Sequence, residues 1–208
     1  MTSRYKNSNK LICGVGINDA DYDVQPWING TKTMCPYYDR WYQMLRRVYK
    51  TTRRPYQNYA NCVVCDDWLY FMNFKRWMEK EDWQGKQLDK DFLSSGVKTY
   101  SPETCIFINN EINQFTKTRN NHKGEHPIGV GFRRGRYIAR VSSGDGSRLS
   151  LGSYLDPMEA HKAWQRGKIQ VGESIILKLD QPLLVIGMRR ILDKLQYELD
   201  NDIETTCI

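Results

Sequence analysis

The sequence predicts an α+β protein built from two units that a polar linker joins. Three observations predict it. Aromatic residues recur at helical spacing through the first half of the chain, and a strand–loop–strand–helix order follows them. Three short alternating segments and one strongly signalled helix occupy the second half. The expected fold is therefore a ββα unit with aromatic-rich helices, then a three-stranded antiparallel sheet on a helix, then a C-terminal helix.

Length, aromatic content, charge and the longest apolar run limit the classes of protein to which this chain can belong. The chain has 208 residues, enough for two small domains with real cores, and 12% of them are aromatic, which a disordered chain would not carry. Its net charge of +7 favours a polyanionic partner such as nucleic acid or an anionic membrane. The longest apolar run, PLLVIGM, is far below the roughly 18 residues of a membrane span. The N-terminus lacks the apolar core of a secretion signal, so we expect a cytoplasmic protein with no membrane partner.

The six cysteines favour reduced, buried thiols. Cys62 and Cys65 form a C-x-x-C pair, but a structural zinc commonly uses two such pairs and no second one exists. Cys105 offers a third ligand, and the three histidines lie far downstream. We therefore expect no structural zinc.

The first half begins with residues 1–36, which we expect to be an irregular arm with one short strand at Leu11–Val15. Residues 37–50 predict a helix, because Trp41, Met44, Leu45 and Val48 recur at helical spacing. Residues 39–54 also hold six basic groups against one acid, and these are Arg40, Arg46, Arg47, Lys50, Arg53 and Arg54. They form either a solvated helix face or a stripe that contacts phosphate.

The aromatic segment and the ββα unit come next. Residues 62–65 predict a short strand, and the helix expected after it places Trp68, Phe71, Phe74, Trp77 and Met78 on one side, as core. Residues 86–115 predict a strand (Gln87–Asp91), a loop, a strand (Cys105–Ile108) and a helix (Asn109–Phe115). We assign residues 37–116 to this unit and residues 117–127 to the linker.

The second half, residues 128–170, predicts three strands in IGVGF, RYIARVS and RLSLGSY, with turns at RRG and SGDGS. The helix after them has Asp156 at the N-cap, Pro157 at N1 and Glu159 at N3, and it turns Ala160, Ala163 and Trp164 inward. Residues 171–208 predict a last helix of about four turns. Its apolar stripe, which can pack on either unit or on a second copy, is Leu183, Ile186, Ile191, Leu195 and Leu199.

Alternation along these strands separates an apolar face from a basic face. Tyr137, Ala139 and Val141 share the inner face with Leu149 and Leu151. The outer face is expected to gather Arg136, Arg140, Arg148 and Ser150, with Arg133 and Arg134 at its edge. Eight Lys or Arg stand against two acids between Lys117 and Arg148, a surplus of six. A small sheet can enter the major groove, where Arg forks onto guanine or contacts phosphate, although a basic face with no partner is the alternative.

The order GV…RGRYIARV…SRLSLGSYLDPMEAHKAW resembles the AP2/ERF-like DNA-binding domain, including the versions found in phage and mobile-element proteins. The match covers roughly residues 128–170 and spans four elements. The resemblance implies a three-stranded sheet that reads the major groove of double-stranded DNA. Carried over residue by residue, the DNA-facing positions are Arg133, Arg134, Arg136, Arg140, Arg148 and Ser150. Separately from this resemblance, the basic stripe at residues 39–54 adds Arg46 and Arg47 as expected DNA contacts.

The stretch LDKDFLSSGVKTYSPETC with the helix after it resembles the ββα-metal unit of HNH nucleases. The matching pieces are Leu88 to Asp91, the Gly96 loop, Ser101 to Cys105, and Asn109, Asn110 and Asn113. With the aromatic segment before it and the AP2-like segment behind it, the chain resembles phage-encoded, homing-type HNH endonucleases over roughly residues 37–170. This implies metal-dependent hydrolysis of a DNA phosphodiester in the cytoplasm of the host cell.

Two positions depart from the HNH pattern. Lys90 stands where the catalytic His is expected, and Thr104 stands where the central Asn is expected. A Lys is a poor base near neutrality unless burial lowers its pKa. The resemblance then implies Asp89, Lys90 and Asn113 as catalytic residues, with Mg²⁺ or Mn²⁺ held by Asp89, Asp91 and Asn113. The alternation also predicts that Asp89 and Asp91 share a face, and the alternative is a salt-bridged turn that only holds the unit together.

Three functions follow from these patterns. The first is a homing-type endonuclease that binds a specific duplex through the sheet and cuts or nicks nearby. The second is a non-catalytic DNA-binding regulator or competitor on a degenerate HNH scaffold. The third is a phage inhibitor that binds a host protein through the aromatic first half.

Overall fold

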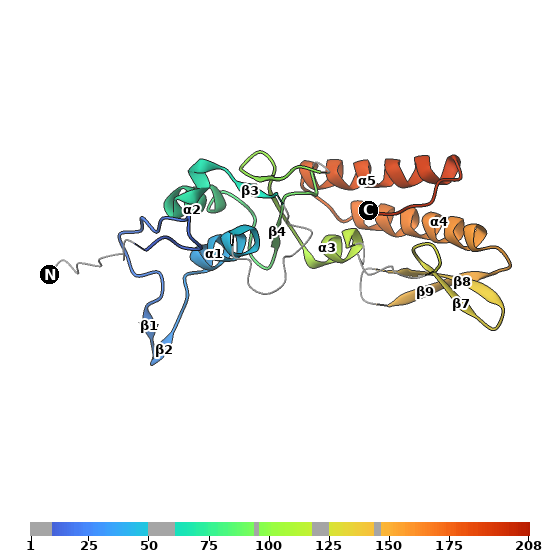
Figure 1. The fold of residues 1–208 in the computed structure, drawn as a ribbon, viewed down its shortest axis with the longest axis horizontal. Helices are drawn as coiled ribbons and strands as arrows, with labels where there is room; N and C mark the ends of the chain where they lie inside the picture. Colours follow the sequence, from blue (N-terminus) through green and yellow to red (C-terminus); the bar gives the residue numbers. More distant parts are fainter. Residues whose placement is uncertain (1–9, 50–60, 94–95, 118–124, 144–146) are drawn as a thin grey trace. The chain divides into compact units, whose positions relative to one another are not determined.

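The protein is α+β. The computed structural model describes residues 10–49, 61–93, 96–117, 125–143 and 147–208. Within these ranges it contains five α-helices and several small sheets, one of them three-stranded and antiparallel (Figure 1). The chain divides into unit 1 (residues 1–107) and unit 2 (residues 108–208), so the helix that we grouped with the ββα unit falls in unit 2. None of the described helices is long and apolar enough to cross a membrane.

Unit 1 consists of short elements. They are β1 (Trp27–Ile28), β2 (Thr31–Lys32), α1 (Pro36–Tyr49), β3 (Val63–Val64), the 3₁₀ helix η2 (Asp66–Leu69), α2 (Phe71–Met78), β4 (Gln87–Asp89), β5 (Thr99–Tyr100) and β6 (Ile106–Ile108). β1 pairs antiparallel with β2, β3 pairs parallel with β5, and β4 hydrogen-bonds to β6. The helix expected at 37–50 and the strands expected at 62–65, 87–91 and 105–108 are therefore confirmed, with shorter strands.

The core of unit 1 is aromatic, as the spacing predicted. Trp41, Met44 and Leu45 of α1 are buried against the aromatic side chains of η2 and α2, which are Trp68, Phe71 and Phe74. The Trp41 indole Nε1–H donates to the Trp68 carbonyl at 2.7 Å, so the one polar atom of this buried ring is satisfied. The aromatic residues of both segments thus act as core.

The N-terminal arm differs from its prediction. The strand expected at Leu11–Val15 is wrong, because Cys13 and Gly14 take positive φ and turn the chain so that the Ile12 N–H donates to the Gly16 carbonyl at 2.8 Å. Residues 10–36 are also not irregular, since they contain the β1–β2 hairpin and contribute the buried Ala20 and Val24 to the core. Lys50, Arg53 and Arg54 of the basic stripe lie outside the described residues.

The single helix expected over the aromatic segment is broken at Tyr70. The Ile17 N–H donates to the Leu69 carbonyl at 2.8 Å, and the Phe71 N–H donates to the Ile17 carbonyl at 3.0 Å. These bonds hold Tyr70 in an extended conformation, so the segment forms η2 and then α2. A pairing with residues more than fifty positions away in the chain therefore overrides a local helical pattern.

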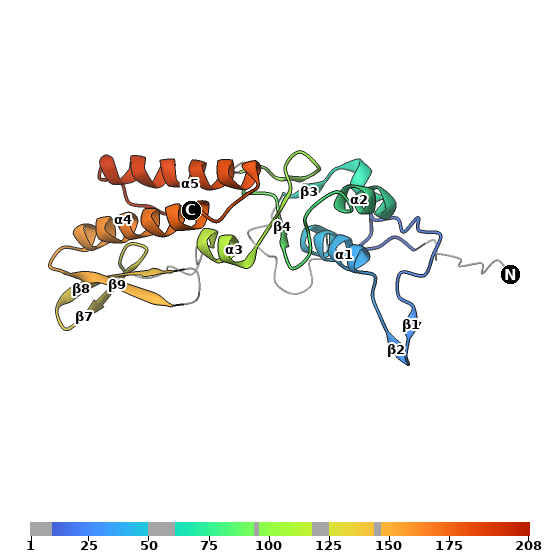
Figure 2. The same ribbon diagram turned by 180° about the vertical axis from the view of Figure 1, so that it is seen from behind.

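Unit 2 has three layers. Its elements are α3 (Asn110–Thr116), β7 (Val130–Arg133), β8 (Arg136–Ser142), β9 (Arg148–Tyr154), α4 (Pro157–Ile176) and α5 (Pro182–Asp200). The strands form an antiparallel sheet in the order β7-β8-β9, as predicted. Figures 1 and 2 show α4 lying between this sheet and α5. Among the described residues of unit 2, no helix lies on the opposite face of the sheet.

Local signals fix the ends of these elements. The Asp156 side chain accepts hydrogen bonds from the N–H groups of Met158 and Glu159 at 2.8 and 2.9 Å, which confirms the N-cap of α4. Arg134 and Gly135 both have positive φ between the paired residues Arg133 and Arg136, as a two-residue type I′ turn requires.

A β-bulge corrects the faces expected for β9. Ile138 pairs with Ser153 but Arg140 pairs with Ser150, so Leu151 and Gly152 together oppose Ala139. Leu149 lies opposite the inward Val141 as expected, yet it is 49% exposed. Beyond the bulge the alternation of β9 is reversed, so that even-numbered residues face α4 and Tyr154 packs against the core.

The stripe expected on the last helix is only half right. Ile191 and Leu195 are buried, whereas Leu183 and Ile186 are 54% and 59% exposed. The buried side is completed by Leu184, Met188 and Leu192, because these positions share the face that contacts α4. α5 therefore packs within unit 2.

Buried polar groups dock the C-terminal tail on α4. The Thr205 N–H donates to His161 Nε2 at 2.9 Å, so Nδ1 carries the imidazole proton and donates it to the Ile128 carbonyl at 2.8 Å. Gln165 donates to the Ile203 carbonyl and to Thr205 Oγ1, and the Thr205 hydroxyl donates to Glu198 Oε2 at 2.6 Å. These buried polar groups therefore form hydrogen bonds with one another in place of water.

The His161 network makes the stability of unit 2 depend on pH. Burial lowers the pKa of His161, against a smaller opposing effect of the Ile128 carbonyl and of the acids Glu204 and Glu198. The unfolded chain takes up this proton below about pH 6.5, while the folded protein resists it. Stability is therefore complete above about pH 6.5 and falls as the pH drops below it.

We expect urea unfolding of the wild type to show this loss between about pH 7.5 and about pH 5.5. His161→Gln removes the histidine from the network and should flatten the profile over this pH range. His126→Gln, which removes a histidine outside the network, keeps the wild-type slope. An unchanged slope in His161→Gln would contradict the assignment.

Candidate functional site

The outer face of the sheet is the first candidate site. Pairing places Arg133 beside Arg136, Arg140 beside Ser150, and Ser142 beside Arg148. These residues alternate with the inward Tyr137, Ala139 and Val141, so their side chains share the face that α4 does not cover. Ser153 also lies on this face, beside Ile138, because of the bulge, and the sequence did not predict it. Gly152 was the one local sign of a bulge in this strand.

This face is positive, and none of its described residues is an acid. Arg133, Arg134, Arg136, Arg140 and Arg148 are all exposed. Across the described part of the chain, no salt bridge involves any of the five, although several lysines elsewhere are paired. Arg136 Nη2 donates to the Ser153 carbonyl at 3.3 Å.

The turn of this face holds a backbone that favours glycine or asparagine. Arg134 has a φ of 53°, a left-handed conformation that costs an ordinary residue about 1–2 kcal/mol. An Asn there would relieve that strain at the same turn. The arginine side chain thus stands at a position where stability alone favours another residue.

The other two predicted DNA-binding arginines lie in unit 1. Arg46 is exposed and Arg47 partly buried in the last turn of α1. Positive side chains at this end also interact favourably with the helix dipole. A structural role accounts for them as well as a phosphate contact does.

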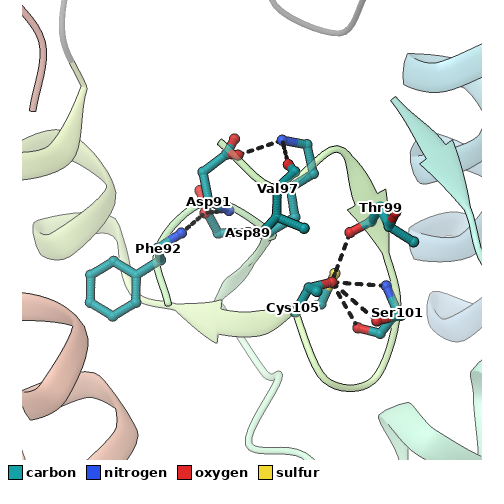
Figure 3. Close-up of polar contacts among 9 residues, drawn as sticks. Asp89, Asp91, Phe92, Val97, Thr99, Ser101 and Cys105 are labelled. Atoms are coloured by element: carbon teal, nitrogen blue, oxygen red, sulfur yellow. Dashed lines mark hydrogen bonds and ion pairs between the residues drawn. The ribbon is translucent and has the colours of Figure 1, made fainter. Parts of the chain in front are cut away.

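The second candidate site is the loop after β4, which Figure 3 shows in close-up. Asp89 Oδ1 accepts hydrogen bonds from the N–H groups of Asp91 and Phe92, both at 2.8 Å. This side-chain turn ends β4 at Asp89, two residues earlier than expected, so the strand alternation does not reach the exposed Asp91. Burial raises the pKa of Asp89, and the two N–H donors oppose that rise.

Lys90 is buried at the centre of this loop. Its side chain is 3% exposed, and Nζ forms an ion pair with Asp91 and donates to the Val97 carbonyl at 3.0 Å. The same Nζ lies 5.9 Å from the centre of the Tyr100 ring. Lys90 therefore ties the two ends of the loop together, and its ammonium is directed at groups of the protein.

The turn from Ser101 to Cys105 holds the position where an HNH unit has its central Asn. The Thr104 hydroxyl there donates to the Thr99 carbonyl at 2.8 Å and accepts from the Ser101 N–H at 3.1 Å (Figure 3). Thr104 is thus a turn-forming residue. Burial raises the pKa of the neighbouring Cys105 to about 12, so this thiol stays protonated, as expected for a buried core cysteine.

Asn113 is buried in α3. Its helix is capped by Asn109, whose side chain accepts from the Ile112 N–H at 2.8 Å. Because α3 belongs to unit 2 and Asp89 to unit 1, the metal site expected from Asp89, Asp91 and Asn113 stays a prediction. In the described ranges no three His, Cys, Asp or Glu residues converge as metal ligands would.

Comparison of the chain with models of protein families, with curated proteins and with solved structures found no match. The likeness to HNH and AP2/ERF-like proteins therefore stays a prediction from the residues quoted above.

The contacts of Lys90 predict a structural role that stability measurements can detect. Lys90→Met keeps most of the side-chain volume but leaves the Val97 carbonyl without its donor and Asp91 without its cation. We expect the free energy of unfolding in urea to fall by about 1–2 kcal/mol.

Lys98→Met is the matched control, because Lys98 is an exposed lysine in the same segment, and its cost should stay within about 0.5 kcal/mol. A Lys90→Met protein that is more stable than the wild type would contradict the structural role. A protein becomes more stable when a strained catalytic side chain is replaced, so that result would indicate a catalytic role for Lys90.

Proposed function

We propose that this protein binds double-stranded DNA in a sequence-dependent way through the outer face of the β7–β9 sheet. The observation that carries the proposal is a set of five exposed arginines on one sheet face and its turn, none of them in a salt bridge within the described residues. Like charges held this close repel one another, so a face of this kind is most stable against a polyanion.

The chemistry of the face fits duplex DNA. Arg offers a planar fork of donors that matches phosphate and the O6/N7 edge of guanine. The side chains beside the arginines on the neighbouring strands, Ser150, Ser153 and Gly131, are small, although Ile138 stands between Arg136 and Arg140. A Cβ built on Gly131 would meet no atom within 4 Å. A duplex can therefore approach the strands closely while the arginines reach past the backbone.

In this proposal the loop at Asp89–Asp91 is a structural element. Asp89 holds two backbone N–H groups, and Lys90 is buried against Asp91 and Val97. A general base or a metal ligand needs a side chain that can reach a substrate or an ion. The geometry therefore favours a DNA-binding protein on an HNH-like scaffold over an active nuclease.

We expect Arg140→Ala to weaken binding to a duplex by about 1–3 kcal/mol and to lower the salt slope of log K by about one. Arg140 lies in the middle of the sheet beside Ser150, so its loss removes a contact near the centre of the face. Fluorescence anisotropy over a range of salt concentrations measures both effects. Selection from a pool of randomised duplexes should yield a motif with the wild type and a broader one with Arg140→Ala.

Arg166→Ala is the matched control, because Arg166 is an exposed arginine of α4 and its substitution removes the same charge as Arg140→Ala. It should leave the selected motif unchanged. If Arg140→Ala and Arg166→Ala behave alike, net charge alone governs binding and the sheet face has no special role.

A metal-dependent endonuclease is the second candidate, and one observation favours it. Asp89 is a partly buried carboxyl with a raised pKa beside the buried Lys90, an environment that is common at catalytic sites. In this reading Asp89 holds Mg²⁺ or Mn²⁺ and Lys90 stabilises charge near the scissile phosphate.

Supercoiled plasmid decides between the two candidates. We expect DNA to be bound equally with Mg²⁺, with Mn²⁺ and with EDTA, and never nicked. Nicking that needs the metal and disappears in Asp89→Asn would establish the endonuclease. Asp89→Asn suits this test because its amide oxygen can still accept from Asp91 and Phe92, so the loop keeps its turn.

A further inference from the structure

The β1–β2 hairpin presents apolar side chains to solvent. Trp27 is 72% exposed and Ile28 is 51% exposed. All six tryptophans lie in the described part of the chain, and Trp27 is the exposed one, whereas Trp41, Trp68 and Trp164 are buried. Figures 1 and 2 both show the hairpin extending away from α1 and α2 of its own unit. The core of unit 1 therefore does not account for Trp27.

The hairpin is built to hold its shape. Asn29 and Gly30 have φ values of 51° and 74°, the positive pair of a type I′ turn, and Asn-Gly is the sequence that this turn favours most. The Thr33 N–H donates to the Pro26 carbonyl and the Cys35 N–H to the Val24 carbonyl, both at 2.8 Å. Val24 is buried in the core, so the base of the hairpin is anchored. A rigid base lets Trp27 bind a partner with little loss of entropy.

Size and charge limit the partner. A stable protein interface needs roughly 800 Å² per partner, far more than a hairpin with two residues in each strand presents. Wedges that enter DNA use only one or two apolar side chains. Lys32 is the cross-strand partner of Trp27, and no acid occurs from Val24 to Tyr38. The hairpin is thus narrow, apolar at Trp27 and Ile28, and otherwise compatible with a polyanion.

We propose that Trp27 stacks on or between the bases of duplex DNA, with Lys32 contacting the adjacent phosphate. This inference rests on the proposed DNA-binding function and adds a second contact of a different kind. An indole ring offers a large flat surface for a base, and stacking does not depend on salt. Inserting the ring unstacks a base step and bends the duplex.

The test measures the affinity, the salt slope and the bend of a mixed-sequence duplex with dyes at both ends, using the full chain. We expect Trp27→Ala to weaken binding roughly tenfold, which corresponds to about 1.4 kcal/mol and lies within the range for stacking one base. The salt slope should stay as in the wild type, and the energy transfer that reports the bend should fall. Trp27→Phe keeps an aromatic ring and should recover most of both effects.

Tyr197→Ala is the matched control, because Tyr197 is a 62% exposed aromatic residue on α5. It should leave affinity and bend unchanged. Since Trp27 is exposed, Trp27→Ala should unfold in urea as the wild type does, which separates a binding effect from a folding effect.

Each outcome decides the inference. Wild-type affinity and wild-type bending in Trp27→Ala overturn it while the proposed function stands. No binding by the wild type overturns both. Flotation of the wild type, but not of Trp27→Ala, with vesicles of phosphatidylcholine and phosphatidylglycerol, together with unaltered DNA binding, assigns Trp27 to a membrane surface and also overturns it.

Discussion

The close approach of α4 to the sheet is the constraint on which the arrangement of unit 2 depends. A Cβ on Gly167 would lie 2.6 Å from Leu151, and a Cβ on Gly129 would lie 2.0 Å from the Trp164 ring. With the small Ala160 and Ala163 on the same side, the helix backbone comes near enough to bury Ala139 and Val141 completely. A single helix can therefore cover the inner face of three strands. The outer face is then free to carry charge that a two-sided core would exclude.

The parts that the sequence predicted are those that local chemistry decides. Alternation located β8, the Asp156 and Pro157 signals located the start of α4, and helical spacing located α1, because each pattern reports which side of an element is buried. The failures come from hydrogen bonds that side-chain periodicity does not report, one with a distant residue and one within a local turn. Ile17 breaks the helix expected across Tyr70, and the Asp89 side chain ends β4 before its alternation reaches Asp91. Neither event leaves a mark in the periodicity of its own segment.

The loop at Asp89–Asp91 shows why residue types alone did not settle its role. Acid–base–acid is the composition of a metal site and equally that of a buried ion pair with a side-chain turn. Burial distinguishes the two uses, since a cation with 3% exposure must be compensated by nearby groups, and Lys90 finds Asp91 and the Val97 carbonyl. Asp89 meanwhile satisfies N–H groups that the end of the strand would otherwise leave unpaired. Asp89, Lys90 and Asp91 thus each have a structural use in the folded loop.

Strand geometry also limits how many base pairs the outer face of the β7–β9 sheet could contact in the proposed function. Residues two apart in a strand are about 6.6 Å apart, close to two base-pair steps of about 3.4 Å each, so Arg136 and Arg140 span about four base pairs. The bulge opposite Ala139 adds twist at that place, and a twisted sheet follows the curvature of a groove better than a flat one. In the proposed function, arginines at this spacing would supply phosphate and base-edge contacts that weaken as salt rises. Stacking by Trp27 would supply a contact that does not weaken as salt rises. The arginines of the sheet and Trp27 together would therefore keep the protein on DNA over a wider range of ionic strength than either alone.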